Sequence, residues 1–292
     1  MDHLLKGAYD LHVHSAPDVL PRKLDDLEMA QRVTASDMKG YAIKSHYFCT
    51  SERAQIIRTL YPRCNAIGAI TLNSAVGGIN PMAVEMAGRS GARIVWFPTV
   101  DSEHEQAHLA SSPSGKLPYW ANIQQQMKAD GVQSPTLCIL EKGKLKSEAT
   151  DVLDVIARFR LVLATSHLSK AETFALVKAA KERKVERVVI THVDFPSTFY
   201  TVEEQRELIR FGAFAEHCYT TPATGKVAWD VVLGQIRAIG PERVVLSTDL
   251  GQATGVFPDE GLALFARKLL ESGFSETDIR TMMVHNPASL IE

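Results

Sequence analysis

Tyr9-Asp10-Leu11-His12-Val13-His14-Ser15 reads as a short strand that ends in two histidines separated by one residue. In a β-strand, side chains i and i+2 point to the same face, and their attachment points lie roughly 6.5–7 Å apart. Two imidazoles at that spacing can converge on one metal ion, and imidazole nitrogen is a preferred ligand of zinc and other first-row metals. The stretch therefore predicts part of a metal site that other strands have to complete.

The composition is that of a globular protein of ordinary polarity. The chain has 292 residues, of which 45% are hydrophobic and 23% charged, and its formal net charge is −2. This balance argues against nucleic acid or an anionic membrane as a partner. The N-terminal stretch has no signal-peptide pattern, and no apolar run reaches membrane-spanning length. The four cysteines are scattered without a Cys-x-x-Cys motif, so we expect reduced thiols and a cytoplasmic location.

Strand-like and helix-like segments alternate along the chain. The expected strands are 9–14, 40–46, 65–71, 92–98, 161–165, 187–191, 213–218 and 243–248. The expected helices are 24–36, 51–61, 81–90, 150–159, 169–183, 202–211, 224–239, 259–272 and 275–284. Eight strand–helix units predict an α/β fold, a (β/α)8 TIM barrel in which residues 1–292 form one domain. The alternative is an open doubly wound sheet, but the turn after the first strand, His14-Ser15-Ala16-Pro17-Asp18, lacks the glycines typical of that fold.

The regular alternation breaks between the fourth and fifth strands. Residues 101–160 are too many for one connection, so we interpret them as an insertion. Ser111-Ser112-Pro113-Ser114-Gly115 is typical of an exposed loop, and the turn Glu141-Lys142-Gly143-Lys144 predicts a small hairpin. Such an insertion could cover a site as a lid or make an oligomer contact.

Five metal-binding side chains fall at the carboxyl ends of predicted strands. His12 and His14 end the first strand, His167 the fifth, His192 the sixth and Asp249 the eighth. In a parallel barrel these ends share one face, where active sites lie. Each histidine alone would be explained more simply as a surface or core residue, but five such groups on one face strongly favour a metal site.

With these residues the sequence resembles the amidohydrolase superfamily of metal-dependent hydrolases, over the whole barrel. The C-terminal segment His285-Asn286-Pro287-Ala288-Ser289-Leu290 also resembles that superfamily. The chain is more narrowly similar to an uncharacterised branch with three further motifs: Lys44-Ser45-His46, Asn73 with Gly77-Gly78, and Trp96-Phe97-Pro98-Thr99.

The resemblance implies roles for these residues. His12, His14 and Asp249 would bind a catalytic divalent metal, and His167 would be a further ligand. His192 would be a ligand or would polarise the substrate, and Asp249 would also be the base that takes a proton from water. Zinc is the expected ion, with manganese and iron as alternatives. A divalent metal lowers the pKa of bound water to about 7, which agrees with these roles.

The end of the fourth strand departs from the superfamily pattern. Two-metal members usually carry a carboxylated lysine or a glutamate there, whereas this chain has Phe97-Pro98-Thr99-Val100. Asp101, Glu103 or His104 could reach in from the following loop. We therefore expect one ion rather than two.

The second strand supplies two further candidates. Lys44 and His46 share a face, so Lys44 is a candidate catalytic residue that could bind a substrate carboxylate or phosphate, and His46 could be a ligand or a proton carrier. A lysine in an apolar strand should have a partner. Glu216 is a third candidate for contact with the substrate. Glu216 and His217 point to opposite faces of their strand, so only one of them can face the site. Gly77-Gly78 is explained more simply as a turn than as an anion site.

These observations favour a hydrolase that cleaves a C–N or C–O bond of a small polar molecule, with decarboxylation as a variant. One alternative is a phosphoesterase of the polymerase and histidinol phosphatase family, but that family ends its last metal strand in Asp-x-His, and Asp249-Leu250-Gly251 lacks the histidine. Another is a non-catalytic barrel that holds a structural metal or a ligand. The expected partners are a small-molecule substrate and a second copy of the chain in a homodimer.

Overall fold

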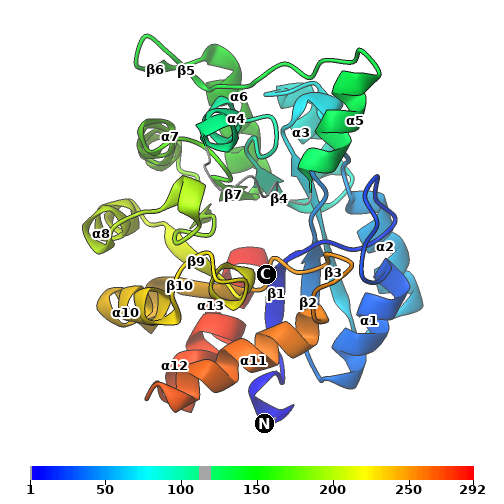
Figure 1. The fold of residues 1–292 in the computed structure, drawn as a ribbon, viewed down its shortest axis with the longest axis vertical. Helices are drawn as coiled ribbons and strands as arrows, with labels where there is room; N and C mark the ends of the chain where they lie inside the picture. Colours follow the sequence, from blue (N-terminus) through cyan, green and yellow to red (C-terminus); the bar gives the residue numbers. More distant parts are fainter. Residues whose placement is uncertain (1, 112–119) are drawn as a thin grey trace.

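The computed structural model describes residues 2–111 and 120–292, and its central feature is a barrel of eight parallel strands (Figure 1). The strands, in spatial order, are β1 (Tyr9–Val13), β2 (Gly40–Ile43), β3 (Asn65–Thr71), β4 (Ala92–Trp96), β7 (Val162–Ala164), β8 (Val188–Ile190), β9 (Phe214–Cys218) and β10 (Val244–Ser247). The predicted (β/α)8 fold is confirmed. β10 closes the barrel on β1 just past its end, where Asp249 N donates to His12 O and His14 N donates to Leu250 O.

Helices surround the barrel (Figure 1). The helices that follow the strands are α1 (Asp26–Ala35), α2 (Ser51–Leu60), α3 (Pro81–Arg89), α6 (Ser147–Phe159), α7 (Lys170–Glu182), α8 (Val202–Arg210), α10 (Trp229–Ile239) and α11 (Pro258–Glu271). Local sequence explains where several begin: Ser169 and Glu172 form a capping box at α7, and Pro81 opens α3 behind the Asn80 cap. The cap predicted at Ser51 lies one residue earlier, at Thr50.

The strands are buried on both faces, as expected of a parallel sheet covered by helices. Leu11, Ile94, Trp96, Val162 and Val245 fill the barrel interior, while outward-facing residues pack against the helices in two large clusters. The C-terminal segment contains α12 (Glu276–Arg280), a π-helical turn at Thr281–His285 and α13 (Asn286–Ile291). None of the helices in residues 2–111 and 120–292 combines the length and apolar character that crossing a bilayer requires.

The long connection between β4 and β7 contains α4 (Glu103–Ser111), α5 (Ala121–Ala129) and the predicted hairpin, formed by β5 (Leu140–Glu141) and β6 (Lys144–Leu145), before α6. Of the predicted exposed loop, residues 112–115 lie outside the described residues. A small apolar cluster ties this connection to the loop after β1; its buried members are Leu20, Val100, Trp120 and Ala121. The connection therefore lies at the carboxyl end of the barrel, where the predicted site residues are.

Candidate metal centre

A bulge in β1 directs both histidines of the opening motif into the barrel. The pairing with β2 shifts between Asp10 and Val13, so β1 has one residue more than its partner over this interval. Val13 faces outward into the helix-packed core, while His12 and His14 face inward and are 0% and 2% exposed. Bulges beside active sites commonly redirect a side chain in this way. The predicted common face of His12 and His14 is present.

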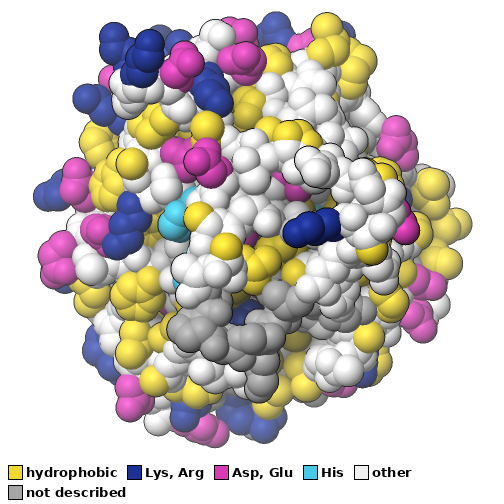
Figure 2. All heavy atoms as spheres, turned by 45° about the horizontal axis from the view of Figure 1, so that its top comes forward, with side chains coloured by type: hydrophobic (Ala, Val, Ile, Leu, Met, Phe, Trp, Pro, Cys, Tyr) yellow, Lys and Arg dark blue, Asp and Glu magenta, His cyan; other side chains and the backbone are white. Residues whose placement is uncertain are grey.

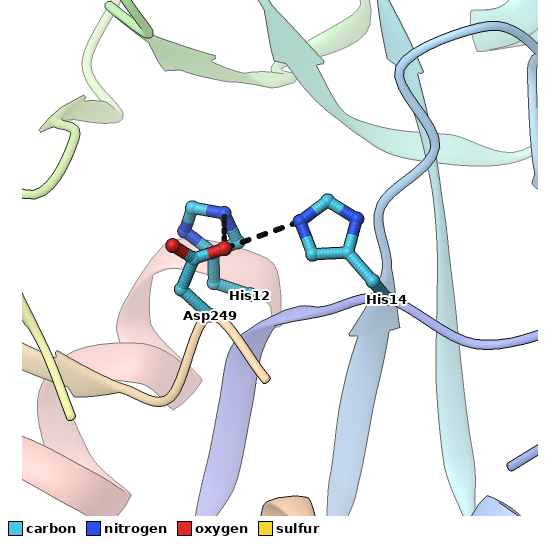
Figure 3. Close-up of side chains that lie close together, drawn as sticks. All are labelled: His12, His14 and Asp249. Atoms are coloured by element: carbon cyan, nitrogen blue, oxygen red, sulfur yellow. Dashed lines mark hydrogen bonds and ion pairs between the residues drawn. The ribbon is translucent and has the colours of Figure 1, made fainter. Parts of the chain in front are cut away.

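The two histidines converge on one carboxylate oxygen (Figure 3). Asp249 Oδ1 lies 3.1 Å from His12 Nε2 and 3.2 Å from His14 Nε2. Asp249 has a φ of 53°, a conformation that only a few non-glycine residues adopt, and its side chain is 18% exposed. Its carboxylate is therefore the part of this group that solvent reaches.

The geometry of these three side chains fits a divalent cation. Two ligand atoms on one tetrahedral zinc ion lie about 3.3 Å apart, close to the separations found here. The pKa of His14 is lowered to about 3, mainly by burial and by the charge of Arg22, so its imidazole is neutral, as a metal ligand has to be. Burial acts to raise the pKa of Asp249, but His12 and His14 hold it well below its ordinary value, so the carboxylate is ionised.

Glu216 lies beneath His12. Its Oε2 is 3.2 Å from His12 Nδ1 and accepts a hydrogen bond from the backbone N–H of His192, and the residue is 1% exposed. A carboxylate on Nδ1 keeps the proton on that nitrogen and leaves Nε2 free as a ligand. Glu216 is thus placed to orient His12, not at the mouth where a substrate would enter. Cys218 Sγ is 3.7 Å from the same Nδ1.

Lys44 contacts the candidate ligands directly. Its Nζ lies 2.8 Å from His12 Nε2 and 4.1 Å from the centre of the Trp96 ring. The lysine is 1% exposed, and burial lowers its pKa. The expectation that this lysine has a partner is met, but the partner is the nitrogen expected to bind metal. A metal ion on His12 Nε2 requires the Lys44 amine to shift or to lose its proton.

His167 and His192 form a second pair in the same site. Their Nε2 atoms are 3.1 Å apart, a separation that also suits two ligands of one ion, and the rings of His192 and His12 are 6.0 Å apart. His192 Nδ1 lies 3.0 Å from Thr198 Oγ1. The pKa of His192 is well below its usual value because of burial and the neighbouring His167.

The residue that reaches this pair from the β4–β7 connection is Glu105. Its Oε2 lies 3.2 Å from His167 Nδ1. Burial acts to raise the pKa of Glu105, but the effect of His167 is larger and lowers the pKa to about 2. Of the three candidates proposed for this position, Glu103 is exposed, His104 contacts the carbonyl of Ser197, and Asp101 accepts the backbone N–H of Ser74. Sequence alone named this loop but not Glu105, because the start of α4 decides which side chain faces the barrel.

His46 lies on the other side of His14, with 4.9 Å between the ring centres. Its Nδ1 is 2.9 Å from Thr99 Oγ1, and Asn73 donates to both Thr99 Oγ1 and the His46 carbonyl. The motif residues Asn73 and Thr99 therefore hold His46 in place. Gly77 and Gly78 form the turn before α3, with Gly78 N donating to Asn73 O.

All five predicted ligands and the predicted Lys44, His46 and Glu216 therefore lie in one region, at the carboxyl end of the barrel. Asp10 supports it from below: it accepts hydrogen bonds from His12 N, Thr248 N and Thr248 Oγ1 and so ties β1 to β10. Burial raises its pKa to about 7. The arrangement can bind a divalent cation, present an ionised carboxylate to a water molecule, and offer neutral imidazoles to a substrate.

Comparison with known proteins agrees with this description. A family described as "Family of unknown function (DUF6282)" matches residues 7–216. No curated protein is significantly similar in sequence. Among solved structures, an amidohydrolase from Pseudomonas aeruginosa is 12% identical, with a TM-score of 0.64 and coverage of 99% of this chain and 97% of that one.

Two further structures have the same fold. A lactonase from Listeria monocytogenes is 12% identical (TM-score 0.54, covering 99% and 96% of the two chains). A β-aspartyl dipeptidase from Fervidobacterium islandicum is 13% identical (TM-score 0.63, covering 98% and 72%). At these identities the similarity establishes the fold. It confirms the predicted (β/α)8 barrel, which this chain shares with these enzymes.

Proposed function

This chain belongs to DUF6282, a family of unknown function, and we propose that it is a metal-dependent hydrolase that cleaves a C–N or C–O bond of a small polar molecule. The observation that carries the proposal is the convergence of His12 Nε2 and His14 Nε2 on one oxygen of Asp249. The solved structures that share the fold include an amidohydrolase, a lactonase and a dipeptidase, which supports the same kind of reaction.

His12, His14 and Asp249 would hold the ion, and His167 and His192 are close enough to contribute. A divalent ion bound there supplies Lewis acidity and lowers the pKa of water. The ionised carboxylate of Asp249, the most exposed of these groups, accepts the proton of the attacking water and returns it to the leaving group. Neutral His192, whose Nδ1 lies against Thr198 Oγ1, presents the lone pair of Nε2 as a further ligand, and Lys44 adds a positive charge when protonated.

We propose one ion, with zinc first and manganese or iron as alternatives. On β4, the strand that supplies a bridging ligand in two-metal members, the inward side chain near the site is Trp96, whose ring lies 4.6 Å from His12. An indole cannot bridge two ions.

The remaining parts of the proposal are a single barrel domain, a small-molecule substrate, a homodimer and a cytoplasmic location. All four cysteines are free, which is consistent with a reducing compartment.

Elemental analysis of protein purified without added metal or chelator tests the proposal first. The wild type should carry about one zinc, manganese or iron per chain, and a His12→Ala, His14→Ala double variant should carry none. A matched His3→Ala, His108→Ala variant, which leaves the site intact, should keep the metal. Panels of amides, lactones and phosphoesters then identify the bond that is cleaved. A wild type that takes up no metal even from excess zinc or manganese would rule out the metallohydrolase.

A further inference from the structure

Building on the proposed function, we propose that the substrate carries an anionic group, a carboxylate or one of similar charge, and that Arg22 and Lys226 bind it. Neither residue belongs to the ligand cluster. The two approach the cluster from different loops: Arg22 is paired with Asp18 through two of its three nitrogens, and Lys226 forms no ion pair among the described residues. Figure 2 brings this end of the molecule forward, with basic side chains and a histidine at the surface near its centre.

Arg22 lies in the loop between β1 and α1. Its backbone pairs with Gln252 in the loop after β10, so the segment spans the two strands that carry His14 and Asp249. The side chain is 3% exposed, and its Nε and Nη2 both donate to Asp18 Oδ2, at 2.8 and 2.6 Å. Asp18 therefore fixes the direction of the guanidinium, and Nη1 has no hydrogen-bond partner among residues 2–111 and 120–292.

The segment of Arg22 is tied to the segment that carries Asp249. Gln252, whose backbone pairs with that of Arg22, donates from Nε2 to the carbonyl of Asp249, and Lys23 N donates to Gly251 O. In keeping with this placement, burial, and with it the charge of Arg22, lowers the pKa of His14 and of His46. A buried arginine with free N–H groups is well suited to bind a carboxylate, because charge-assisted hydrogen bonds strengthen where water is excluded.

Lys226 lies on the opposite side, in the loop between α9 (Thr220–Ala223) and α10. Its Nζ is 4.3 Å above the centre of the Phe195 ring, and that ring lies 4.8 Å from the ring of His192. Among the described residues it forms no ion pair: Asp249 and Glu105 act on its charge only from beyond ion-pair distance. An unpaired ammonium one ring away from His192 can bind an anion that enters beside Asp249.

A purely structural role is the alternative for Arg22, since its pair with Asp18 also holds the β1–α1 loop. The two explanations differ in what they predict for ligands. A structural ion pair changes stability but does not distinguish a charged ligand from a neutral one of the same size. An anion site distinguishes them strongly, because a hydrogen bond to a charged group contributes about 1.5–3 kcal/mol, or roughly 10- to 100-fold in affinity.

Glutarate and glutaramide are suitable probes because they match in size and differ in charge. Isothermal titration calorimetry should show that wild-type protein binds glutarate at least about tenfold more tightly than glutaramide. Arg22→Gln should lose about tenfold or more of the glutarate affinity, Lys226→Gln about threefold, and the exposed control Lys178→Gln none. Arg22→Lys keeps the charge and should recover part of the loss, and it covers the case in which Arg22→Gln folds poorly. No glutarate binding by the wild type, equal affinity for the two probes, or unchanged glutarate affinity in Arg22→Gln would each overturn the inference.

The same titrations on metal-loaded and chelator-treated protein separate this inference from the proposed function. Arg22 and Lys226 belong to the chain, so their contribution to glutarate affinity should persist without metal. Hydrolysis by a metal-loaded enzyme that does not distinguish the probes would refute the anionic substrate and leave the hydrolase intact. Glutarate binding that depends on Arg22, in a protein that takes up no metal, would support the anion site and refute the hydrolase.

Discussion

The carboxylate of Glu216 lies 3.2 Å from Nδ1 of His12, on the side of the imidazole opposite the nitrogen that faces Asp249 and His14. Both residues are fully or almost fully buried. Their contact joins β9 to β1 across the barrel interior and decides which nitrogen of His12 is available to a metal ion. It makes Glu216 a residue that positions a ligand.

Glu216→Gln should therefore weaken metal binding. A neutral amide holds the Nδ1 proton less firmly, and loss of such a carboxylate partner typically costs about 10- to 100-fold in metal affinity. Competition with a fluorescent chelator measures this affinity directly. Glu207→Gln, at an exposed position on α8, is the matched control and should bind metal like the wild type. Equal affinity in both variants would show that His12 is oriented without Glu216.

Asp249→Asn should affect both metal content and hydrolysis. The amide removes a negative ligand and cannot accept a proton from water, and loss of a general base typically costs about 10²–10⁴-fold in rate. Hydrolysis of the best substrate, measured at equal metal occupancy, separates the two effects. The exposed Asp151→Asn on α6 serves as the control. A fully loaded Asp249→Asn enzyme with the wild-type rate would require another base.

Glu105→Gln tests whether the β4–β7 connection contributes to the site. Because its pKa is about 2, the ionised Glu105 stabilises the fold above about pH 4.5, and this contribution is lost as the pH falls toward 2. The variant should unfold with a free energy about 1–3 kcal/mol lower at pH 7, as expected when a buried charge-assisted contact is removed. Urea denaturation measures the difference. Glu103→Gln, two residues earlier and exposed, should be close to the wild type.

The pKa of Asp10 predicts a change of stability with pH that is opposite in sign to the one expected for Glu105. Its pKa rises to about 7 in the folded protein, so the folded state holds a proton that the unfolded state loses above about pH 4. This group therefore destabilises the fold progressively from about pH 4 to about pH 7, by up to about 4 kcal/mol. Asp10→Asn removes the effect.

Urea denaturation of chelator-treated protein at pH 4.5 and pH 8 measures the contribution of Asp10, because other titrating groups cancel when the variant is compared with the wild type. Relative to the wild type, Asp10→Asn should gain stability as the pH rises, whereas the exposed Asp130→Asn should not. A stability difference that does not change with pH would mean that Asp10 is ionised throughout, held by its three hydrogen bonds.

Gly251→Ala should disturb the site through the backbone. Gly251 has a φ of +131°, and a Cβ there would overlap the carbonyl oxygen of His14. We expect a loss of about 2–4 kcal/mol in the free energy of unfolding and reduced metal content, because His14 has to move. Gly273→Ala is the control: its φ is also positive, but a Cβ there meets nothing within 4 Å, so only the backbone cost of about 1 kcal/mol applies. Equal effects of the two substitutions would exclude the steric contact with His14.

The strand–helix alternation could be predicted from the sequence because it depends on local patterns: apolar strands of five to seven residues, capping residues and turn residues. The convergence of the candidate ligands could also be predicted, because the inward-facing side chains at the carboxyl ends of parallel barrel strands share one mouth. No knowledge of the loops was needed to place these five residues, which are His12, His14, His167, His192 and Asp249. Side chains fixed by strand register are therefore determined by the sequence itself.

The tertiary structure alone decided the residues that support and flank this set. Glu105 depends on where α4 begins, and Arg22 depends on the pairing of its loop with Gln252, more than two hundred residues away. The contacts of Glu216 and Lys44 with His12 depend on how three strands stagger around the barrel. Such contacts result from packing between segments that are distant in sequence, and no local pattern encodes them.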